Sequence, residues 1–248
     1  MKIVVAGATG TLGRHVIQAL HEAGCEPVPL SRSTGTDLVT GVGLADALRG
    51  ASAVIDASAT SSTSTSASVE FFTAVTENLL AAEREAGVPH HVAISIIGAA
   101  RVRANYYAGK AAQEDLLTSR DGGWSLLRTT QFHDFALQLI GHGKVGPLQV
   151  VPTMRSQPIS TSEVASELVA IATGEPQGLV PDLAGPREEN MADLVRRLLA
   201  ASGRRRPVLQ IPLPGAWGRG MRDGSLLPAR GTRHGEMTFD AWLDSRSA

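Results

Sequence analysis

A short apolar run followed at once by three regularly spaced glycines constrains the fold of this chain most. Residues 3–6 are unbroken and apolar, as expected of a strand buried on both faces of a parallel sheet. Gly7, Gly10 and Gly13 follow at intervals of three, and apolar residues then recur at helical spacing as far as Gly24. A strand, a glycine-rich turn and a helix together form the first unit of an alternating α/β fold.

The same alternation of amphipathic segments and apolar runs continues along the chain. The amphipathic segments predict helices at residues 69–86 and 108–119. The apolar runs predict further strands at residues 54–57, 92–97, 125–128 and 149–151. Because strands that alternate with helices pair in parallel, we predict an α/β fold built on a doubly wound parallel sheet.

Two early segments depart from this simple pattern. The second strand is expected at residues 25–30, where Pro27 and Pro29 remove two N–H donors that point to the same side. That side must be poorly paired, and we expect it to face a very short third strand at residues 36–38. Residues 58–68 are almost entirely Ser, Thr and Ala, which indicates either a flexible surface loop or a loop bordering a ligand site at the carboxyl edge of the sheet.

The sequence pattern changes after about residue 144, where proline becomes frequent. Six prolines between residues 147 and 186 break it into short pieces, which predicts a main domain at residues 1–145 and a small C-terminal α/β lobe at residues 146–248, partly interleaved with it. Ser160 and Glu163 offer a capping box for a helix that ends at Gly174, and Asn190 can cap a second helix. The basic run 204–206 follows that second helix, where a solvated helix end is favoured over a phosphate site.

Composition excludes several classes of function. With 23 Lys+Arg against 24 Asp+Glu, the formal net charge of −1 provides no field that would gather nucleic acid or an anionic membrane. No apolar run reaches the about 18 residues that a membrane-spanning helix needs. The single cysteine, Cys25, cannot form an internal disulfide, and no ligand-like spacing of His and Cys predicts a metal site. We therefore expect a cytoplasmic protein with no nucleic-acid, membrane or metal partner.

The glycine turn has a specific chemistry. Glycine permits a tight turn and a close approach of the backbone to a pyrophosphate, and the free N–H groups at the start of the following helix favour an anion. A glycine pattern with a strand before it and a helix after it therefore predicts a dinucleotide site. The residues of this site are Gly7, Thr9, Gly10, Thr11, Leu12 and Gly13.

The spacing Gly-x-x-Gly-x-x-Gly resembles that of the short-chain dehydrogenase/reductase superfamily, and more narrowly of its atypical, NmrA-like branch. The matching motifs are the glycine turn, Asp37-Leu38, Asn78-Leu79-Leu80, Ile94-Ser95-Ile96-Ile97-Gly98, Tyr106 to Lys110 and Leu127-Arg128. The resemblance implies a Rossmann-type fold that binds NAD(P). The branch contains quinone and other carbonyl reductases, sugar-nucleotide enzymes, and regulators that bind dinucleotide without turning it over.

The end of the second strand bears on cofactor choice. A carboxylate there would hold the ribose 2′-OH of NAD, but residues 30–33 read Leu-Ser-Arg-Ser and contain no acid. The fork of Arg32 suits a 2′-phosphate, so we predict NADP as cofactor with NAD as the alternative; a solvated surface arginine is the competing interpretation. The resemblance implies that Asp37 and Leu38 line the adenine, and that Ala57 and Ala59 lie beneath the nicotinamide ribose.

Tyr106 and Lys110 are the candidate catalytic residues. Four residues apart in a helix, they share a face, and a nearby cation lowers the pKa of a phenol and so prepares it for proton transfer. Lys110 would also bind the nicotinamide ribose, and the resemblance implies that Ser95 helps bind a carbonyl oxygen. The competing interpretation is a packing tyrosine and a surface lysine. Tyr107 lies three residues from Lys110, which breaks the family spacing.

Other polar residues have two interpretations each. Thr130, Phe132, His133 and Asp134 follow a predicted strand where a substrate would lie, whereas His133 and Asp134 could instead cap the next helix. Asn78 matches a position that supports the lysine through water in relatives, or has a structural role. His90 and His91 precede a strand and are predicted to be turn residues.

The function predicted from these residues is an NADPH-dependent reductase of a small carbonyl or quinone compound, acting as a monomer or homodimer on a small-molecule substrate. The main alternative is a non-catalytic NAD(P)-sensing regulator. A sugar-nucleotide epimerase or dehydratase is less favoured, because those enzymes usually carry a larger substrate lobe.

Overall fold

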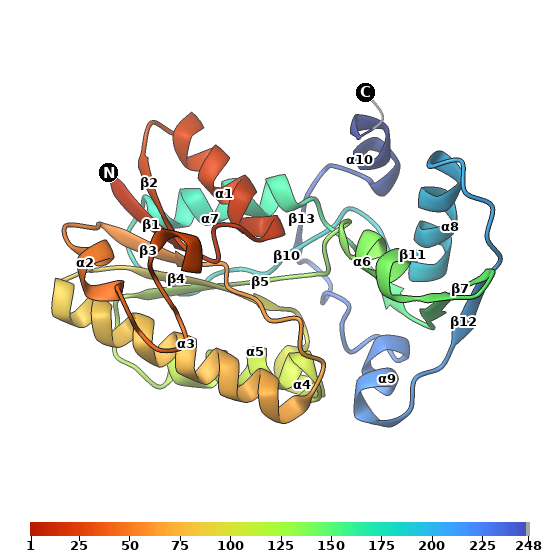
Figure 1. The fold of residues 1–248 in the computed structure, drawn as a ribbon, viewed down its shortest axis with the longest axis horizontal. Helices are drawn as coiled ribbons and strands as arrows, with labels where there is room; N and C mark the ends of the chain where they lie inside the picture. Colours follow the sequence, from red (N-terminus) through yellow and green to blue (C-terminus); the bar gives the residue numbers. More distant parts are fainter. Residues whose placement is uncertain (247–248) are drawn as a thin grey trace.

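The computed structural model describes residues 1–246 and is built around a parallel sheet (Figure 1). The strand order is β2-β1-β3-β4-β5-β10-β13, and every neighbouring pair is parallel. In chain order these strands are β1 (Lys2–Ala6), β2 (Glu26–Leu30), β3 (Ala53–Asp56), β4 (His91–Ile96), β5 (Trp124–Thr129), β10 (Leu183–Ala184) and β13 (Arg233–His234). The short strand β9 (Gly178–Leu179) also pairs with β5. The predicted doubly wound parallel sheet is confirmed.

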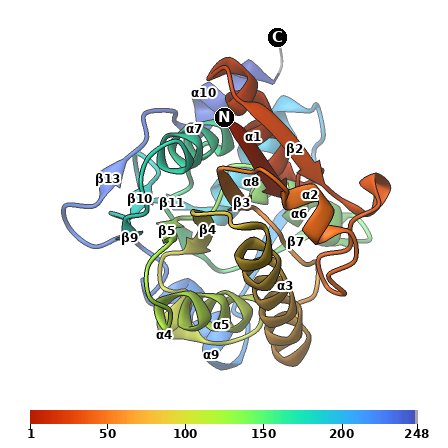
Figure 2. The same ribbon diagram turned by 90° about the vertical axis from the view of Figure 1, so that its left-hand side faces the viewer.

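Helices cover both faces of this sheet (Figures 1 and 2). One face carries α1 (Thr11–Glu22) and α7 (Thr161–Ala172), and the other carries α2 (Leu44–Leu48), α3 (Thr65–Ala86), α4 (Ala99–Val102) and α5 (Tyr106–Thr118). Successive strand residues point to opposite faces, so Ile3 and Val5 pack beneath α1 while Val4 packs toward α3. Both faces are therefore apolar, which explains the unbroken apolar run of β1.

The second strand lies at the edge of the sheet. Glu26 donates its N–H to Met1 O, just before β1, and N–H directions alternate, so positions 27 and 29 point away from β1. Prolines are tolerated at these two positions because no strand pairs on that side. The predicted third strand at residues 36–38 is wrong: the chain forms the 3-10 helix η1 (Arg32–Thr34), and Asp37 then builds a turn by accepting bonds from Val39 N and Thr40 N.

A second lobe follows β5 at the carboxyl end of the sheet, on the right of Figure 1. Its elements are α6 (Phe135–His142), β6 (Lys144–Val145), β7 (Leu148–Pro152), β8 (Arg155–Ser156), β11 (Glu189–Asn190), α8 (Met191–Ala201), β12 (Val208–Ile211), α9 (Gly215–Arg222) and α10 (Phe239–Ser245). The predicted strand at 149–151 exists as β7, but it belongs to a separate sheet of order β12-β7-β6. Between these elements the chain returns to the main sheet with α7, β9, β10 and β13.

The predicted helix caps have different outcomes. Asn190 Oδ1 accepts from Ala192 N, 2.9 Å away, which confirms the cap of α8. The capping box at Ser160 is wrong, because the Ser160 hydroxyl bonds to the Ser162 hydroxyl instead. Glu163 Oε1 accepts from Glu236 N and Met237 N, so tertiary partners replace the local one.

The two histidines at the start of β4 are buried rather than part of an exposed turn. His91 begins the strand, and its Nδ1 lies 2.7 Å from Glu83 Oε1 of α3. His90 Nε2 lies 2.8 Å from the Ser125 hydroxyl of β5. The expectation of turn residues is wrong because both side chains have buried polar partners from distant parts of the chain. Within residues 1–246, no helix has the length and apolar character needed to cross a membrane.

Candidate functional site

The glycine turn lies where the main sheet changes direction. The chain leaves β1 for β2 on one side and later crosses to β3 on the other, which makes this the switch point at which open α/β sheets bind ligands. Gly7 has φ +74°, and a Cβ atom there would lie 2.7 Å from Ala57 O. A Cβ atom on Gly13 would lie 2.6 Å from Ala8 Cα. Both glycines are needed for β1, α1 and the end of β3 to meet.

The start of α1 has no side-chain cap and no acidic residue in its first turn. Gly10 is the N-cap residue, and it is exposed together with Thr9. Leu12 packs its side chain into the core, so its predicted contribution to a ligand comes from its backbone. The first N–H groups of this 12-residue helix therefore face an open surface with positive helix-dipole character, which suits a phosphate.

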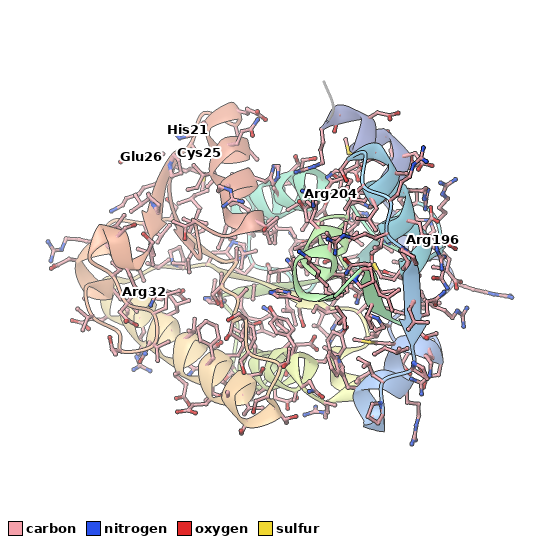
Figure 3. All side chains as sticks on the ribbon, turned by 45° about the vertical axis from the view of Figure 1, so that its right-hand side comes forward. His21, Cys25, Glu26, Arg32, Arg196 and Arg204 are labelled. Atoms are coloured by element: carbon pink, nitrogen blue, oxygen red, sulfur yellow. The ribbon has the colours of Figure 1, made fainter. Side chains whose placement is uncertain are left out.

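Arg32 lies on η1, directly after β2, with its side chain exposed (Figure 3). In the part of the chain that the structure describes, no carboxylate forms an ion pair with it. Ser31 and Ser33, on either side of it, share a hydrogen bond of 2.8 Å. A guanidinium flanked by hydroxyl groups fits a 2′-phosphate, and no carboxylate is present there to accept a hydrogen bond from a 2′-OH.

The turn at residues 37–42 is fixed by α3. Asn78 Nδ2 donates to Leu38 O at 3.0 Å and to Val39 O at 2.7 Å. Leu38 packs against the core beneath α2 and α3. Asn78 therefore has a structural role, because its side-chain N–H groups bond to this turn, and support of Lys110 through water stays a prediction. The adenine contacts of Asp37 and Leu38 stay a prediction.

The segment rich in Ser, Thr and Ala connects the glycine turn to the start of α5. Ser58 Cα lies 2.8 Å from the point that a Gly7 Cβ atom would occupy. At the other end, Asn105 donates its backbone N–H to Thr65 Oγ1 and its side-chain amide to Thr63 O. These contacts favour the interpretation that this loop borders the ligand site. Ala57 is buried at its start and Ala59 is exposed.

Lys110 is almost fully buried, with 3% of its surface exposed. Its ammonium donates to Ile94 O at 2.9 Å and to Gln113 Oε1 at 3.0 Å, and it lies 4.3 Å from the centre of the Phe72 ring. Burial lowers the pKa of Lys110 to about 8, although the carboxylates of Asp56 and Glu114 oppose this shift. A surface lysine, the competing interpretation, is wrong.

Tyr106 packs edge-on against the same Phe72 ring, with the ring centres 5.4 Å apart. Burial raises the pKa of Tyr106, and the Asp56 carboxylate raises it further. The expectation that Lys110 lowers this pKa is therefore wrong, because burial and the Asp56 carboxylate both raise it. Tyr106 keeps its proton, as a donor must. Tyr107 is buried, and its pKa is also raised by burial.

Ser95 lies in β4, and its side chain is 0% exposed. Asp56, the last residue of β3, is in register with Ala93 of β4, so Ser58, two residues after β3, lies at a similar height to Ser95 near the end of β4. Within residues 1–246, neither hydroxyl has a hydrogen-bond partner. These two buried hydroxyl groups without partners form a polar region below the protein surface, near the carboxyl ends of β3 and β4. Direct contact of Ser95 with a carbonyl oxygen stays a prediction.

Asp56 and Gln113 were not predicted from the sequence. Asp56 is fully buried, and its Oδ2 accepts from Gln113 Nε2 at 2.7 Å. Its Oδ1 accepts from Ser58 N at 2.9 Å. The sequence signal for Asp56 was an acidic residue at the end of an apolar run, Val54-Ile55-Asp56. The sequence signal for Gln113 was its position three residues after Lys110, on the same helix face.

The predicted substrate residues connect the main sheet to the second lobe. Thr130 Oγ1 accepts from Gly185 N at 3.1 Å, and Phe132 packs into the core and pairs with Ile159. His133 is buried against Phe239, and its Nε2 lies 3.0 Å from Met237 O. Each residue thus has a structural contact, and a substrate contact for any of them stays a prediction.

Asp134 is the N-cap residue of α6, but its side chain accepts no capping hydrogen bond. Its Oδ2 accepts from Thr161 Oγ1 at 2.7 Å, so it bridges α6 to the start of α7. The capping interpretation is therefore wrong, because the carboxylate is used in a tertiary contact.

The basic run 204–206 follows α8, which lies in the second lobe, away from β1 and α1 (Figure 1), and Figure 3 labels Arg204. With Arg196 it lines a surface hollow of about 460 Å³. Arg204 and Arg205 are exposed, as the solvated helix end predicts.

The parallel sheet has an uncapped helix start at its switch point, and the arginine after its second strand has no ion-pair partner among residues 1–246. This combination defines a dinucleotide-binding α/β protein. A family model described as NAD(P)H-binding matches residues 7–175, and the chain belongs to this family. No curated protein sequence matches the chain.

Several solved structures share the fold at low sequence identity. A short-chain dehydrogenase/reductase superfamily protein from Agrobacterium tumefaciens, with bound NAD, is 18% identical with a TM-score of 0.69, covering 100% of this chain and 96% of its own. An NADPH-dependent quinone oxidoreductase from Escherichia coli, complexed with NADPH, is 17% identical with a TM-score of 0.72, covering 98% and 99%. UDP-glucose 4-epimerase from Thermus thermophilus, complexed with NAD, is 17% identical with a TM-score of 0.70, covering 99% and 93%. The predicted resemblance to this superfamily is confirmed at the level of fold and cofactor-binding family.

Proposed function

We propose that this protein is a reductase that uses NADPH, with NAD as the alternative cofactor, to reduce a small carbonyl or quinone compound. The observation that carries this proposal is the placement of Tyr106 next to the loop that borders the glycine turn. Asn105 holds that loop through Thr63 and Thr65, and Tyr106 is the next residue. A proton donor therefore lies at the same edge of the sheet as the dinucleotide site.

Residues of the chain have separate roles in the proposed complex. Backbone groups of the glycine turn hold the pyrophosphate, and Arg32 binds the 2′-phosphate. The bound cofactor supplies a hydride to the carbonyl carbon. Tyr106 donates its phenolic proton to the carbonyl oxygen, which balances the charge of the transferred hydride.

Burial of the candidate catalytic residues favours a second function, an NAD(P)-sensing regulator. Ser95 is 0% exposed and Lys110 is 3% exposed. A regulator needs the dinucleotide site but no access of a second substrate to these groups. Turnover separates the two proposals.

The experiment follows NADPH oxidation in the presence of quinones, aldehydes and ketones, for the parent protein and the Tyr106→Phe variant. Loss of a general acid costs about a hundredfold to ten-thousandfold in rate, so Tyr106→Phe should lose at least a hundredfold while NADPH affinity stays unchanged. The matched control is Tyr107→Phe, which removes the neighbouring buried hydroxyl and should retain turnover. Equal rates for Tyr106→Phe and the parent would show that Tyr106 is not the acid. Tight NADPH binding without turnover in either protein would favour the regulator.

A further inference from the structure

Lys110 forms one end of a buried chain of hydrogen bonds that crosses from α5 to β3. Lys110 Nζ donates to Gln113 Oε1 at 3.0 Å, and Gln113 Nε2 donates to Asp56 Oδ2 at 2.7 Å. Gln113 and Asp56 are both 0% exposed. The chain continues to the ligand-bordering loop, where Ser58 N donates to Asp56 Oδ1.

The direction of this chain is determined by its two ends. An ammonium can only donate hydrogen bonds, and a carboxylate can only accept them. The amide of Gln113 must therefore turn its oxygen to Lys110 and its nitrogen to Asp56. A flipped amide would place two donors together at one end and two acceptors at the other. Gln113 is thus held in a single orientation, and it positions the ammonium.

Asp56 is the carboxylate best placed to balance the buried charge of Lys110. The groups that face the ammonium are Asp56 on β3, Glu114 on its own helix, and the Phe72 ring on α3. Glu114 Oε2 already accepts two hydrogen bonds from Arg128 of β5. Within residues 1–246, Asp56 forms no ion pair, and it acts on Lys110 through Gln113 and through its charge at longer range. Without a nearby anion, a buried ammonium loses its proton.

We propose that Asp56 and Gln113 are positioning residues that hold Lys110 in place as a cation beside the dinucleotide site. Ile94 O and Gln113 use two of the three N–H donors of the ammonium, which leaves one donor for a ligand. Asp56 and Gln113 act through Lys110 and make no contact with cofactor in this proposal. The role of Lys110 in turnover rests on the proposed function, whereas its charge and position do not.

The test measures the protonation of Lys110 directly, in the protein without cofactor. The chain has three lysines, Lys2, Lys110 and Lys144, so protein labelled with 13C-lysine gives three Cε signals by NMR. The signal of Lys110 is the one absent from Lys110→Met. Its pKa should lie at about 8 in the parent protein. In Asp56→Asn, which keeps the shape of the side chain, the midpoint should fall by about one pH unit or more.

Two further variants make the test specific. Gln113→Met removes both amide hydrogen bonds and should also lower the midpoint, and it replaces Asp56→Asn if that variant does not fold. Asp115→Asn changes an exposed carboxylate on the same helix, paired with Arg103, and should leave the midpoint unchanged. An unchanged Lys110 midpoint in folded Asp56→Asn or Gln113→Met would overturn the proposal.

A second measurement separates this proposal from the proposed function. NADPH affinity of the parent should fall as the pH rises through the midpoint of Lys110, and Asp56→Asn should shift that fall to lower pH. A protein that does not bind NADPH would contradict the proposed function, while the Lys110 titration would still decide the roles of Asp56 and Gln113.

Discussion

The three glycines of the first turn have different roles at the scale of single residues. Gly7 and Gly13 have no space for a Cβ atom, because the backbone of residues 57 and 8 lies within 3 Å of it. Gly10 has an ordinary extended conformation, with φ −72° and ψ 174°, and the nearest atom to its Cβ position is Gly7 O at 3.2 Å. The fold therefore tolerates a side chain at Gly10 far better than at the other two positions.

Gly10→Val should abolish dinucleotide binding and leave the fold largely intact, because the added side chain extends over the open start of α1. Calorimetry with NADPH measures the binding, and thermal unfolding measures the fold. Gly13→Ala is the comparison, and it should lower the unfolding temperature because its Cβ would lie 2.6 Å from Ala8 Cα. Unchanged NADPH affinity in Gly10→Val would place the binding site elsewhere.

Arg32→Ala should weaken NADPH binding while NADH binding stays nearly unchanged. A hydrogen bond to a charged phosphate contributes about 1.5–3 kcal/mol, which corresponds to roughly tenfold to a hundredfold in affinity. The control is Arg49→Ala, an exposed arginine that pairs with Asp46 on α2. Titration calorimetry with both cofactors checks the result. If the parent protein binds NADH and NADPH with equal affinity, Arg32 does not bind the 2′-phosphate.

Buried polar pairs connect secondary-structure elements, and the pair of Glu83 on α3 with His91 on β4 is titratable. Burial opposes the charge on His91, but the Glu83 carboxylate outweighs it and raises the histidine pKa. A raised pKa in the folded state stabilises the fold below the unfolded value of about 6.5, and this contribution is lost as the pH rises through the folded pKa.

His91→Gln should therefore cost more stability at pH 6 than at pH 9. Chemical denaturation at the two pH values measures this difference. His21→Gln, at an exposed histidine of α1 (Figure 3), is the matched control for replacing a histidine with glutamine. An equal cost of His91→Gln at both pH values would mean that His91 is not protonated in the folded protein.

At the scale of the whole molecule, α10 contacts both the second lobe and the main domain. Phe239 is buried in the lobe core, and its ring lies 5.6 Å from that of His133, which follows β5. Asp240 forms ion pairs with Arg187 and with Arg197 of α8. The segment before α10 is held by Glu163 of α7 through Glu236 N and Met237 N. These contacts join α10 to both parts of the molecule.

Phe239→Ala should lower the free energy of unfolding by about 3–5 kcal/mol, because it leaves a cavity in the lobe core. Denaturant unfolding measures this loss. Asp244→Ala, at an exposed position of the same helix, should change stability by no more than about 0.5 kcal/mol. A loss for Phe239→Ala as small as that of Asp244→Ala would mean that α10 does not contribute to the stability of the lobe.

The sequence by itself determined the features that depend on local chemistry. The spacing of hydrophobic residues predicts the strands and the long helices. The spacing of the glycines predicts the turn after β1, and prolines at alternate positions predict that one side of β2 is unpaired. The side chain of Asn190 likewise caps its own helix. These features need only the conformational preferences of neighbouring residues, so they can be predicted from one short segment at a time.

Only the tertiary structure decided the features that depend on desolvation and on distant partners. Asp56 and Gln113 lie 57 residues apart, and no local pattern predicts their hydrogen bond. The rise of the Tyr106 pKa comes from burial and from Asp56, whereas helical spacing alone predicted a fall. His133 could not be recognised as a core residue before α10 was placed against it. In each case the charge or the contact is set by groups that only folding brings together.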